Sequence, residues 1–249
     1  MVFTGVAAPA LPIQLDKLWA EILGCEPEDL RKGRVCVVPR EGDDVHVFLT
    51  PDGGVVAVPP GGEPFVAEAN PEQLLDAEWW TATLGVSPAH LAWHGPSAIW
   101  YATPETFVPQ PHPFARRLRR RDAGELARFA RILHAREPGM FHYWAIGGRE
   151  IGQVPLWGLY YQGRLVAVAG ERAWSEKVRE IGVNVLPRWR QRGFGTAVVS
   201  LATEDILKER ALAMWMCALD NLPGTRIAMR LGYRPYAHHF WLRPSGAAG

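Results

Sequence analysis

Residues 185–195 read VLPRWRQRGFG and join an expected strand at 180–185 to an expected helix. The strand stops at Pro187, and Gly193 and Gly195 lead into the helix. The first-turn amides of a helix have no internal acceptor and point outward at the positive end of its dipole. Glycine lets a bulky anion approach such a backbone closely. The segment therefore predicts a phosphate or pyrophosphate site; the alternative is a tight turn with no ligand.

The helix after the two glycines is expected from its apolar spacing. Val198, Leu201, Ala202 and Ile206 recur on one face of a 3.6-residue period. The segment before it lacks both the GK[ST] end of a Walker loop and the three glycines of a dinucleotide fingerprint. The expected phosphate ligand is therefore neither ATP nor NAD.

A second motif lies downstream. The run AMWMCA at 213–218 predicts a strand, Asn221 opens a helix, and LGY at 231–233 ends it. Together with RQRGFG at 190–195, this order and separation resembles the GNAT superfamily of N-acetyltransferases, over about residues 113–243. The resemblance implies an α/β (α+β) fold whose mixed sheet is flanked by helices and splays between the strands at 180–185 and 213–218.

The resemblance also implies a cosubstrate, acetyl-CoA, whose acetyl group moves to a primary amine of a small molecule or peptide in a ternary complex. The pantetheine arm would run along the strand at 183–185, the pyrophosphate would meet the loop, and one asparagine would contact the arm from the other side. The expected binding residues are Val183, Asn184, Val185, Arg190, Gln191, Arg192, Gly193, Phe194, Gly195, Thr196 and Asn221.

The transfer needs a base for the ammonium proton, directly or through water. Glu180 is the first candidate and Glu171 the second; each is equally compatible with a surface carboxylate at a strand end. Many family members carry a tyrosine acid at the position that Ala228 occupies here. That departure leaves open a non-catalytic acetyl-CoA sensor or partner-binding module. The expected substitute acid is Tyr236, and the alternatives are Tyr233, His238, His239 and Cys217.

The chain is expected to form two domains, at 1–108 and 113–249, because prolines at 109, 111 and 113 interrupt regular structure. The first is a smaller α+β domain: a worn-down copy of the same fold, a lid over the acceptor, or a stabilising neighbour. We expect a helix at 15–23, a strand at 34–38, a hairpin at 45–49 and 55–58, a helix at 71–84 and a strand at 98–101.

In the second domain we expect a strand at 114–118 and then a helix to about residue 134. Asp122 and Glu125 form its predicted capping box. A hairpin at 157–161 and 165–169 turns at Gln162-Gly163. The aromatic run FHYW at 141–144 either cradles a cationic amine or is packing.

The overall composition of the chain argues against several kinds of partner. The net charge of +1 argues against partners that depend on bulk electrostatics, so neither nucleic acid nor an anionic membrane is expected. Three scattered cysteines provide neither a disulfide framework nor a zinc site, and no metal is expected. The chain has no long apolar stretch and opens without a secretory signal, so we expect a cytoplasmic protein, with a homodimer as one allowed assembly.

Overall fold

The computed structural model describes residues 13–66, 68–85, 87–137 and 154–244. The chain forms two compact units. The first unit draws on 1–99, 217–221 and 235–249, and the second on 100–216 and 222–234. Each unit is described by itself below. The predicted linear domain boundary between residues 108 and 113 stays a prediction.

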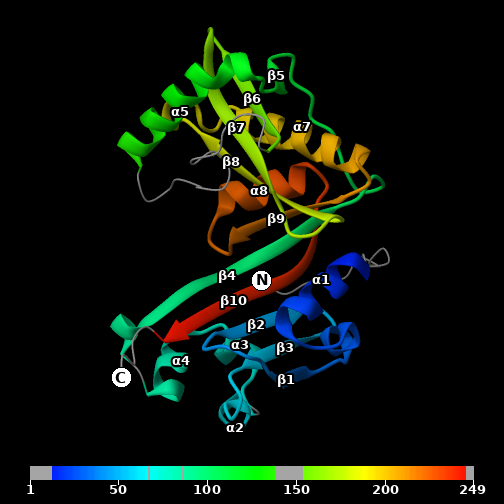
Figure 1. Ribbon diagram of the computed structural model, residues 1–249, viewed down its shortest axis with the longest axis vertical. Helices are drawn as coiled ribbons and strands as arrows, with labels where there is room; N and C mark the ends of the chain where they lie inside the picture. The colour runs from blue at the N-terminus through cyan, green and yellow to red at the C-terminus, as the bar shows by residue number, and fades with distance from the viewer. Residues whose placement is uncertain (1–12, 67, 86, 138–153, 245–249) are drawn as a thin grey trace. The chain divides into compact units, whose positions relative to one another are not determined.

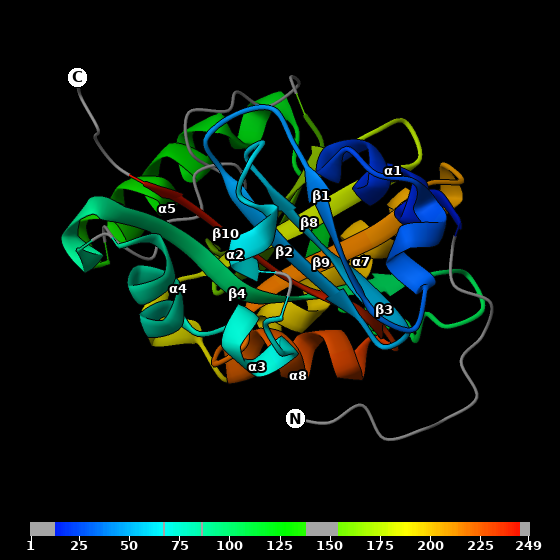
Figure 2. The same cartoon turned by 90° about the horizontal axis from the view of Figure 1, so that it is seen from below.

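The first unit contains a mixed sheet whose strands run in the order β1-β3-β2-β10-β4. β1 pairs in parallel with β3, whereas β2 is antiparallel to both β3 and β10; the three blue and teal strands lie side by side in Figure 2. Its strands are β1 (Val35–Pro39), β2 (Val45–Thr50), β3 (Gly53–Val58), β4 (Leu91–Ala102) and β10 (Arg234–Pro244), and its helices are α1 (Ile13–Leu23), η1 (Pro27–Arg31), α2 (Glu63–Val66), α3 (Pro71–Leu74), α4 (Ala77–Leu84) and η2 (Pro88–His90) (Figure 1).

Most first-unit elements were predictable, and one prediction was wrong. The expected hairpin forms between β2 and β3, and the helix near residue 15 forms as α1. The single helix predicted at 71–84 is instead two helices. Asn70 does cap the first, since its Oδ1 accepts from the Gln73 amide at 2.9 Å. Asp76 then caps a second helix through the Glu78 amide at 2.9 Å, and an N-cap residue cannot continue a helix.

Alternation along β2 and β10 gives the first-unit sheet two different faces. One face is apolar, and there Val47, Leu74, Trp80 and Phe240 belong to one buried cluster. On the other face, buried residues of β2 and β10 meet α1: Trp19 packs against Phe48, with ring centroids 4.7 Å apart. The first unit therefore has a core on both sides of its sheet.

Two histidines lie buried on the α1 face. His46 on β2 and His239 on β10 approach through Nδ1 and Nε2 at 3.2 Å, with nearly parallel rings. Burial lowers the pKa of His46 to about 4 and that of His239 to about 3. The charged groups that act on His46 are Arg40, Asp44 and Arg243, and burial outweighs the attraction of Asp44. Both rings are therefore neutral near pH 7.

This pair predicts a loss of stability in mild acid. An unfolded histidine titrates near pH 6.5, above the native value, so protons favour the unfolded chain. Stability is then complete above about pH 6.5 and falls as the pH approaches 4, by on the order of 3 kcal/mol for each histidine. Urea unfolding between pH 7.5 and 4.5 measures this change. The slope should shrink in His46→Phe and persist in a His90→Gln control, whose side chain is exposed; equal slopes in all three proteins would contradict the prediction.

The second unit contains a sheet in the order β9-β8-β7-β6-β5, with β8 and β9 parallel and the other pairs antiparallel. Its strands are β5 (Ala115–Arg117), β6 (Leu156–Tyr161), β7 (Arg164–Ala173), β8 (Val178–Val185) and β9 (Leu212–Ala218), and its helices are η3 (Arg120–Asp122), α5 (Ala123–Arg136), η5 (Pro187–Trp189), α7 (Phe194–Lys208) and α8 (Leu222–Arg230). The expected mixed sheet flanked by helices is thus confirmed.

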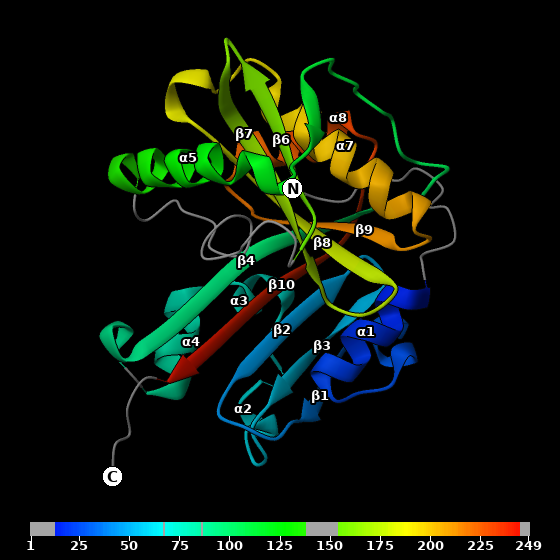
Figure 3. The same ribbon diagram turned by 45° about the horizontal axis from the view of Figure 1, so that its top comes forward.

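Helices α5 and α7 cover opposite faces of the second-unit sheet (Figure 3). On one face Phe129 of α5 belongs to a buried cluster with Leu156 and Val168. On the other, the Trp157 indole N–H donates to Asp205 of α7 at 2.7 Å. Because neighbouring strand residues point to opposite faces, each β7 or β8 side chain can be assigned to the α5 face or the α7 face.

The hairpin between β6 and β7 is confirmed, whereas the capping box before α5 is wrong. Gln162 and Gly163 have φ values of 51° and 73°, the left-handed pair that a tight hairpin turn needs. Asp122 does stand at the start of α5, yet its carboxylate caps no amide of that helix and accepts from the Arg119 amide before it at 2.8 Å. It also accepts from Arg116 at 2.7 and 2.8 Å and from the Tyr160 hydroxyl at 2.9 Å. A cation and a phenol compete better for this carboxylate than a helix amide does.

Candidate functional site

The β7–β8 register determines where the backbone of β8 points. The Leu186 amide donates to the Val166 carbonyl at 3.0 Å, and Val185 is paired with Ala167. Hydrogen-bonded and non-bonded pairs alternate in an antiparallel ladder. The amides and carbonyls of Val183 and Val185 therefore point away from β7, toward the β9 side.

On that side the pairing between β8 and β9 is short. It runs from Val178 opposite Leu212 to Glu180 opposite Met214, and β8 continues to Val185 with no further β9 partner among the described residues. This agrees with the splay expected between these strands. The Val183 backbone and the Val185 amide are thus not engaged by either neighbouring strand, and they can pair with a strand-like ligand.

Glu180 lies where the pairing ends, and its side chain points to the α5 face. It is buried, and its Oε2 accepts from the Trp174 indole N–H at 2.7 Å. Burial raises the pKa of this carboxyl, and the Trp174 hydrogen bond and the Arg172 charge oppose the rise. A carboxyl with a raised pKa is a stronger proton acceptor once ionised.

Glu171 lies on β7 opposite Ile181, so it faces α7 and not α5. Its Oε1 accepts from Arg179 at 2.7 Å, and both groups are part of one ion pair. Burial raises the pKa of Glu171 and the Arg179 charge opposes the rise. The two base candidates therefore lie on opposite faces of the same strand pair, and Glu171 alone has a cation in contact.

The loop between β8 and α7 places glycine at a position that needs it. Gln191 has φ 61° and Gly193 has φ 80°, and Gly193 is the N-cap of α7 with no side-chain capping bond. A Cβ on Gly193 would meet nothing within 4 Å, whereas one on Gly195 would lie 3.2 Å from Val185 Cγ2. Glycine at 193 thus suits the backbone conformation, and glycine at 195 suits the close packing of α7 on β8.

Three arginines surround this loop, and one already has a partner. Arg190 donates through Nε to the Val185 carbonyl at 3.1 Å and binds both carboxylate oxygens of Glu137, which follows α5. Arg188 and Arg192 are exposed, and their guanidinium groups lie 5.6 and 5.0 Å from the Trp189 ring centroid. Arg190 therefore braces the loop, while the other two present their charge to solvent.

The first turn of α7 contains a buried aromatic side chain, Phe194, and backbone amides that have no capping side chain. Phe194 is buried, and its ring lies 5.1 Å from that of Tyr161 and 5.8 Å from that of His112. These contacts anchor the first turn. The backbone amides of 194–196 lie in that turn, and no side chain caps them.

Two predicted asparagines differ in their surroundings. Asn184 is buried on the α5 face, the same face as Glu180, and its Nδ2 has no hydrogen-bond partner among the described residues. Asn221 stands directly before α8, and its backbone amide donates to the Ala218 carbonyl at 3.0 Å. Asn221 belongs to the first unit, so its predicted contact with the pantetheine arm stays a prediction.

The candidate acids are mostly buried. Tyr233 shares a hydrogen bond of 2.7 Å with Thr203 on α7. Tyr236, in the first unit, donates to Asp16 Oδ1 at 2.7 Å, and Arg31 donates to the same oxygen. Burial is the main cause that raises the pKa of both phenols. Ala228 is fully buried in α8, and its carbonyl accepts from the Tyr233 amide.

Three further alternatives for the acid are His238, His239 and Cys217. His239 pairs with His46 as described above, and its neighbour His238 points to the opposite face of β10. Cys217 is buried in β9. The aromatic run at 141–144 lies outside the described residues.

Two residues at this site were not predicted. Trp174 follows β7 and binds Glu180, and Glu137 follows α5 and binds Arg190. Of these two residues, only Trp174 is close in sequence to its partner. It lies six residues before Glu180, on the other side of a short turn. Glu137 lies 53 residues from Arg190, and no local pattern connects them.

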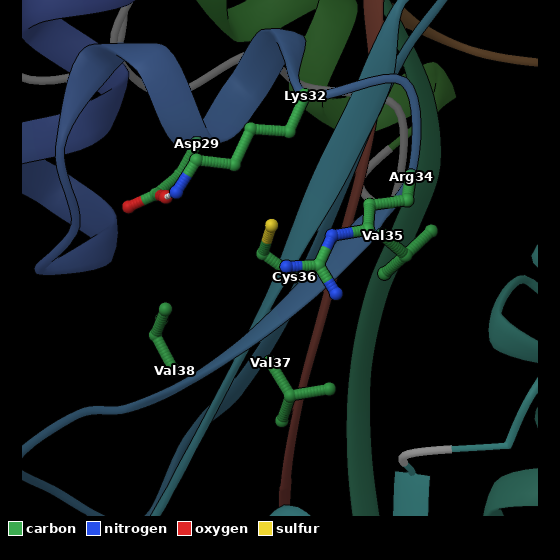
Figure 4. A pocket seen from close by; sticks show the side chains of 7 residues that line it. All are labelled: Asp29, Lys32, Arg34, Val35, Cys36, Val37 and Val38. Carbon is green, nitrogen blue, oxygen red and sulfur yellow. Dashed lines mark hydrogen bonds and ion pairs between the residues drawn. The ribbon is translucent and has the colours of Figure 1, made fainter.

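A separate pocket of about 380 Å³ lies in the first unit along β1. Figure 4 shows Asp29 beside Lys32 on one side of it, and Arg34 beside Cys36. None of its lining residues is a predicted site residue. Among the described residues, no three His, Cys, Asp or Glu side chains are arranged to hold a metal ion, and none of the described helices is long and apolar enough to cross a membrane.

Comparison with known proteins agrees with the two motifs. Residues 157–239 match the sequence model of the GNAT acetyltransferase family. This match runs from β6 into the first half of β10 and includes Glu180, the loop and Asn221. The predicted resemblance is therefore confirmed over these residues. No curated protein matches the chain.

Solved structures with a similar fold are distant in sequence. A GNAT-family acetyltransferase from Novosphingobium aromaticivorans is 23% identical, with 65% of this chain and 70% of that chain covered and a TM-score of 0.49. A GCN5-related N-acetyltransferase from Kribbella flavida is 18% identical, covering 67% and 64%, with a TM-score of 0.48. A GNAT-family acetyltransferase from Colwellia psychrerythraea is 12% identical, covering 76% of each, with a TM-score of 0.49. At these values the neighbours carry no argument about activity.

Proposed function

We propose that this protein is an acyl-CoA-dependent N-acetyltransferase that moves the acetyl group of acetyl-CoA to a primary amine. The observation that carries the proposal is the course of the chain from β8 to α7. A strand edge leaves its β9 partner after Glu180 and continues to an uncapped helix start at Gly193. Such a path offers strand-like hydrogen bonds to an extended amide arm and free amides to a pyrophosphate.

The residues fit acetyl-CoA in three respects. The Val183 amide and carbonyl and the Val185 amide point away from β7, so they are available to the pantetheine amides, while the Val185 carbonyl accepts from Arg190. Gly193 leaves open space beside the first-turn amides of 194–196. Arg188 and Arg192 add positive charge that suits phosphate oxygens. We assign to cosubstrate binding Val183, Asn184, Val185, Arg190, Gln191, Arg192, Gly193, Phe194, Gly195, Thr196 and Asn221.

In the proposed reaction Glu180 takes the proton of the acceptor ammonium, directly or through water. The neutral amine attacks the thioester carbonyl carbon and the C–S bond breaks; the attacking nitrogen gives up its second proton to water, and the departing CoA thiolate takes a proton from the proposed acid. Holding amine and thioester together contributes up to about 7–11 kcal/mol in ideal cases. A β8 amide near Val183 would donate to the developing oxyanion. Glu180 is preferred to Glu171 because Arg179 already neutralises Glu171.

Tyr236 stays the proposed acid, and a matched pair of variants tests it. Burial keeps its phenol protonated, as a donor must be, although the hydroxyl already donates to Asp16. Tyr236→Phe should lose about 1–2 kcal/mol of stability and about tenfold or more in kcat. Tyr233→Phe, which loses the bond to Thr203, should lose stability only. Urea unfolding and CoA-release kinetics measure both; an unchanged kcat in Tyr236→Phe would leave that residue a purely structural role.

The second candidate function is a non-catalytic acetyl-CoA sensor, which Ala228 favours. Calorimetric titration with acetyl-CoA, followed by a CoA-release assay over a broad amine panel, separates the two. Saturable binding with amine-dependent release supports the enzyme. Binding without release from any amine supports the sensor, and no binding removes both. The acceptor and the acyl chain length are outcomes of the same assay.

A further inference from the structure

Glu180 is held by a side chain that none of the motifs includes. The Trp174 indole N–H donates to Glu180 Oε2 at 2.7 Å. Glu180 is 3% exposed, so this bond is shielded from competing water. An indole N–H donates and cannot accept, so it orients Oε2 and leaves proton uptake to Oε1. The bond therefore determines both the rotamer of Glu180 and which of its oxygens is free.

A third side chain keeps the indole in place. The Arg172 guanidinium lies 4.4 Å from the Trp174 ring centroid, in cation–π contact. Arg172 is also the direct cross-strand partner of Glu180, so both side chains point to the same face. The Arg172 guanidinium thus contacts the Trp174 indole, and the indole contacts the Glu180 carboxylate, where the β8–β9 pairing ends.

We propose that Trp174 is a positioning residue of this enzyme, that its indole N–H orients the Glu180 carboxylate for proton uptake from the acceptor, and that Arg172 supports it. This inference rests on the proposed function, because it gives Glu180 the role of base. Trp174 itself touches neither the amine nor acetyl-CoA in this scheme; it acts through Glu180.

The charges around Glu180 make the expected pH effect simple to assign. Burial raises the pKa of Glu180, and the Trp174 hydrogen bond and the Arg172 charge lower it. Among the described residues Arg172 is the one charged group that acts on this carboxyl. On β9 the partner is Met214, which is uncharged. No charged group of α5 shifts the pKa of Glu180, and the same holds for the other charged residues of β7, the turn and β8, which are Arg164, Glu171, Glu176, Lys177 and Arg179.

Trp174→Phe removes the N–H and keeps a ring for Arg172 to contact. The acidic limb of kcat/KM against pH should move upward by about one pH unit, because the ionised form loses its donor. At high pH, where Glu180 is ionised in both proteins, kcat should still be about tenfold lower, because the carboxylate loses its orientation. Arg172→Gln should move the same limb upward through the lost charge, and it serves as a second variant if Trp174→Phe folds poorly.

The chain offers a matched control in Trp157→Phe. Trp157 donates its indole N–H to a carboxylate at the same distance, 2.7 Å, but that carboxylate is Asp205 on the α7 face. This variant should lose comparable stability and leave both the limb and the high-pH kcat unchanged. A shift of the limb in the control as large as in Trp174→Phe would overturn the positioning role.

A second readout separates this inference from the proposed function. The Glu180 carboxyl can be titrated by carbon NMR in glutamate-labelled protein without ligand, with Glu180→Gln to assign the signal. A higher pKa in Trp174→Phe together with a shifted limb supports the inference. A higher pKa with an unmoved limb shows that the bond exists but that Glu180 is not the base. No change in either overturns the inference, while amine-dependent turnover by the parent protein would still uphold the proposed function.

Discussion

Replacing Glu180 by glutamine is expected to lower kcat for acetyl transfer by about 10²–10⁴-fold, the range that a general base contributes. The amide retains the shape of the side chain and can still accept from the Trp174 indole, but it cannot take up a proton. The dissociation constant for acetyl-CoA should stay the same, because Glu180 makes no contact with the cosubstrate in the proposed scheme. Steady-state CoA release and calorimetry measure the two quantities on the same preparation.

Glu171→Gln is the matched control for that variant. Glu171 is also a buried carboxylate on the β7–β8 pair, yet it faces α7 and is paired with Arg179. Its replacement leaves Arg179 without its carboxylate and should cost stability, with kcat retained. The opposite pattern, in which Glu171→Gln abolishes turnover and Glu180→Gln does not, would exchange the two assignments.

The second large effect is expected at the helix start. Gly193→Glu should weaken acetyl-CoA binding by about 100-fold or more, equivalent to about 2.7 kcal/mol, because it places a negative charge beside the proposed pyrophosphate site. A Cβ at this position meets no atom within 4 Å, so a side chain has room and collision does not explain the effect. Gly195 is unsuitable for the same test, since its Cβ would press on Val185.

Gly163→Glu controls for the cost of the backbone. Gly163 has φ 73°, close to the 80° of Gly193, and its Cβ position is equally open, but it lies in the β6–β7 turn. Both variants should lose roughly 1 kcal/mol of stability from the left-handed conformation. Calorimetry should then find intact binding in Gly163→Glu alone. Equal binding by the two variants would remove the pyrophosphate site from Gly193.

Local sequence was sufficient for the elements whose determinants are close together in the chain. Alternating apolar residues and Gln162-Gly163 specify the β6–β7 hairpin, because side-chain period and turn geometry are local properties. The helix α7 follows in the same way from residues three and four apart. The helix predicted at 71–84 failed for a local reason too: Asp76 is a capping residue inside an otherwise helical pattern.

The features of the site also divide into those that local sequence predicts and those that it does not. Spacing and motif were enough to predict that a glycine-rich turn connects a strand to a helix, and that one candidate carboxylate lies near the start of β8 and the other near the end of β7. Which carboxylate has a cation in contact depends on the tertiary structure, because Arg179 reaches Glu171 only through the β7–β8 register. The tertiary structure also decided that Arg190 is bound to Glu137 across 53 residues and that Trp174 binds Glu180. Hydrogen bonds and desolvation depend on distances in space, and these are set by packing between elements, which no single segment specifies.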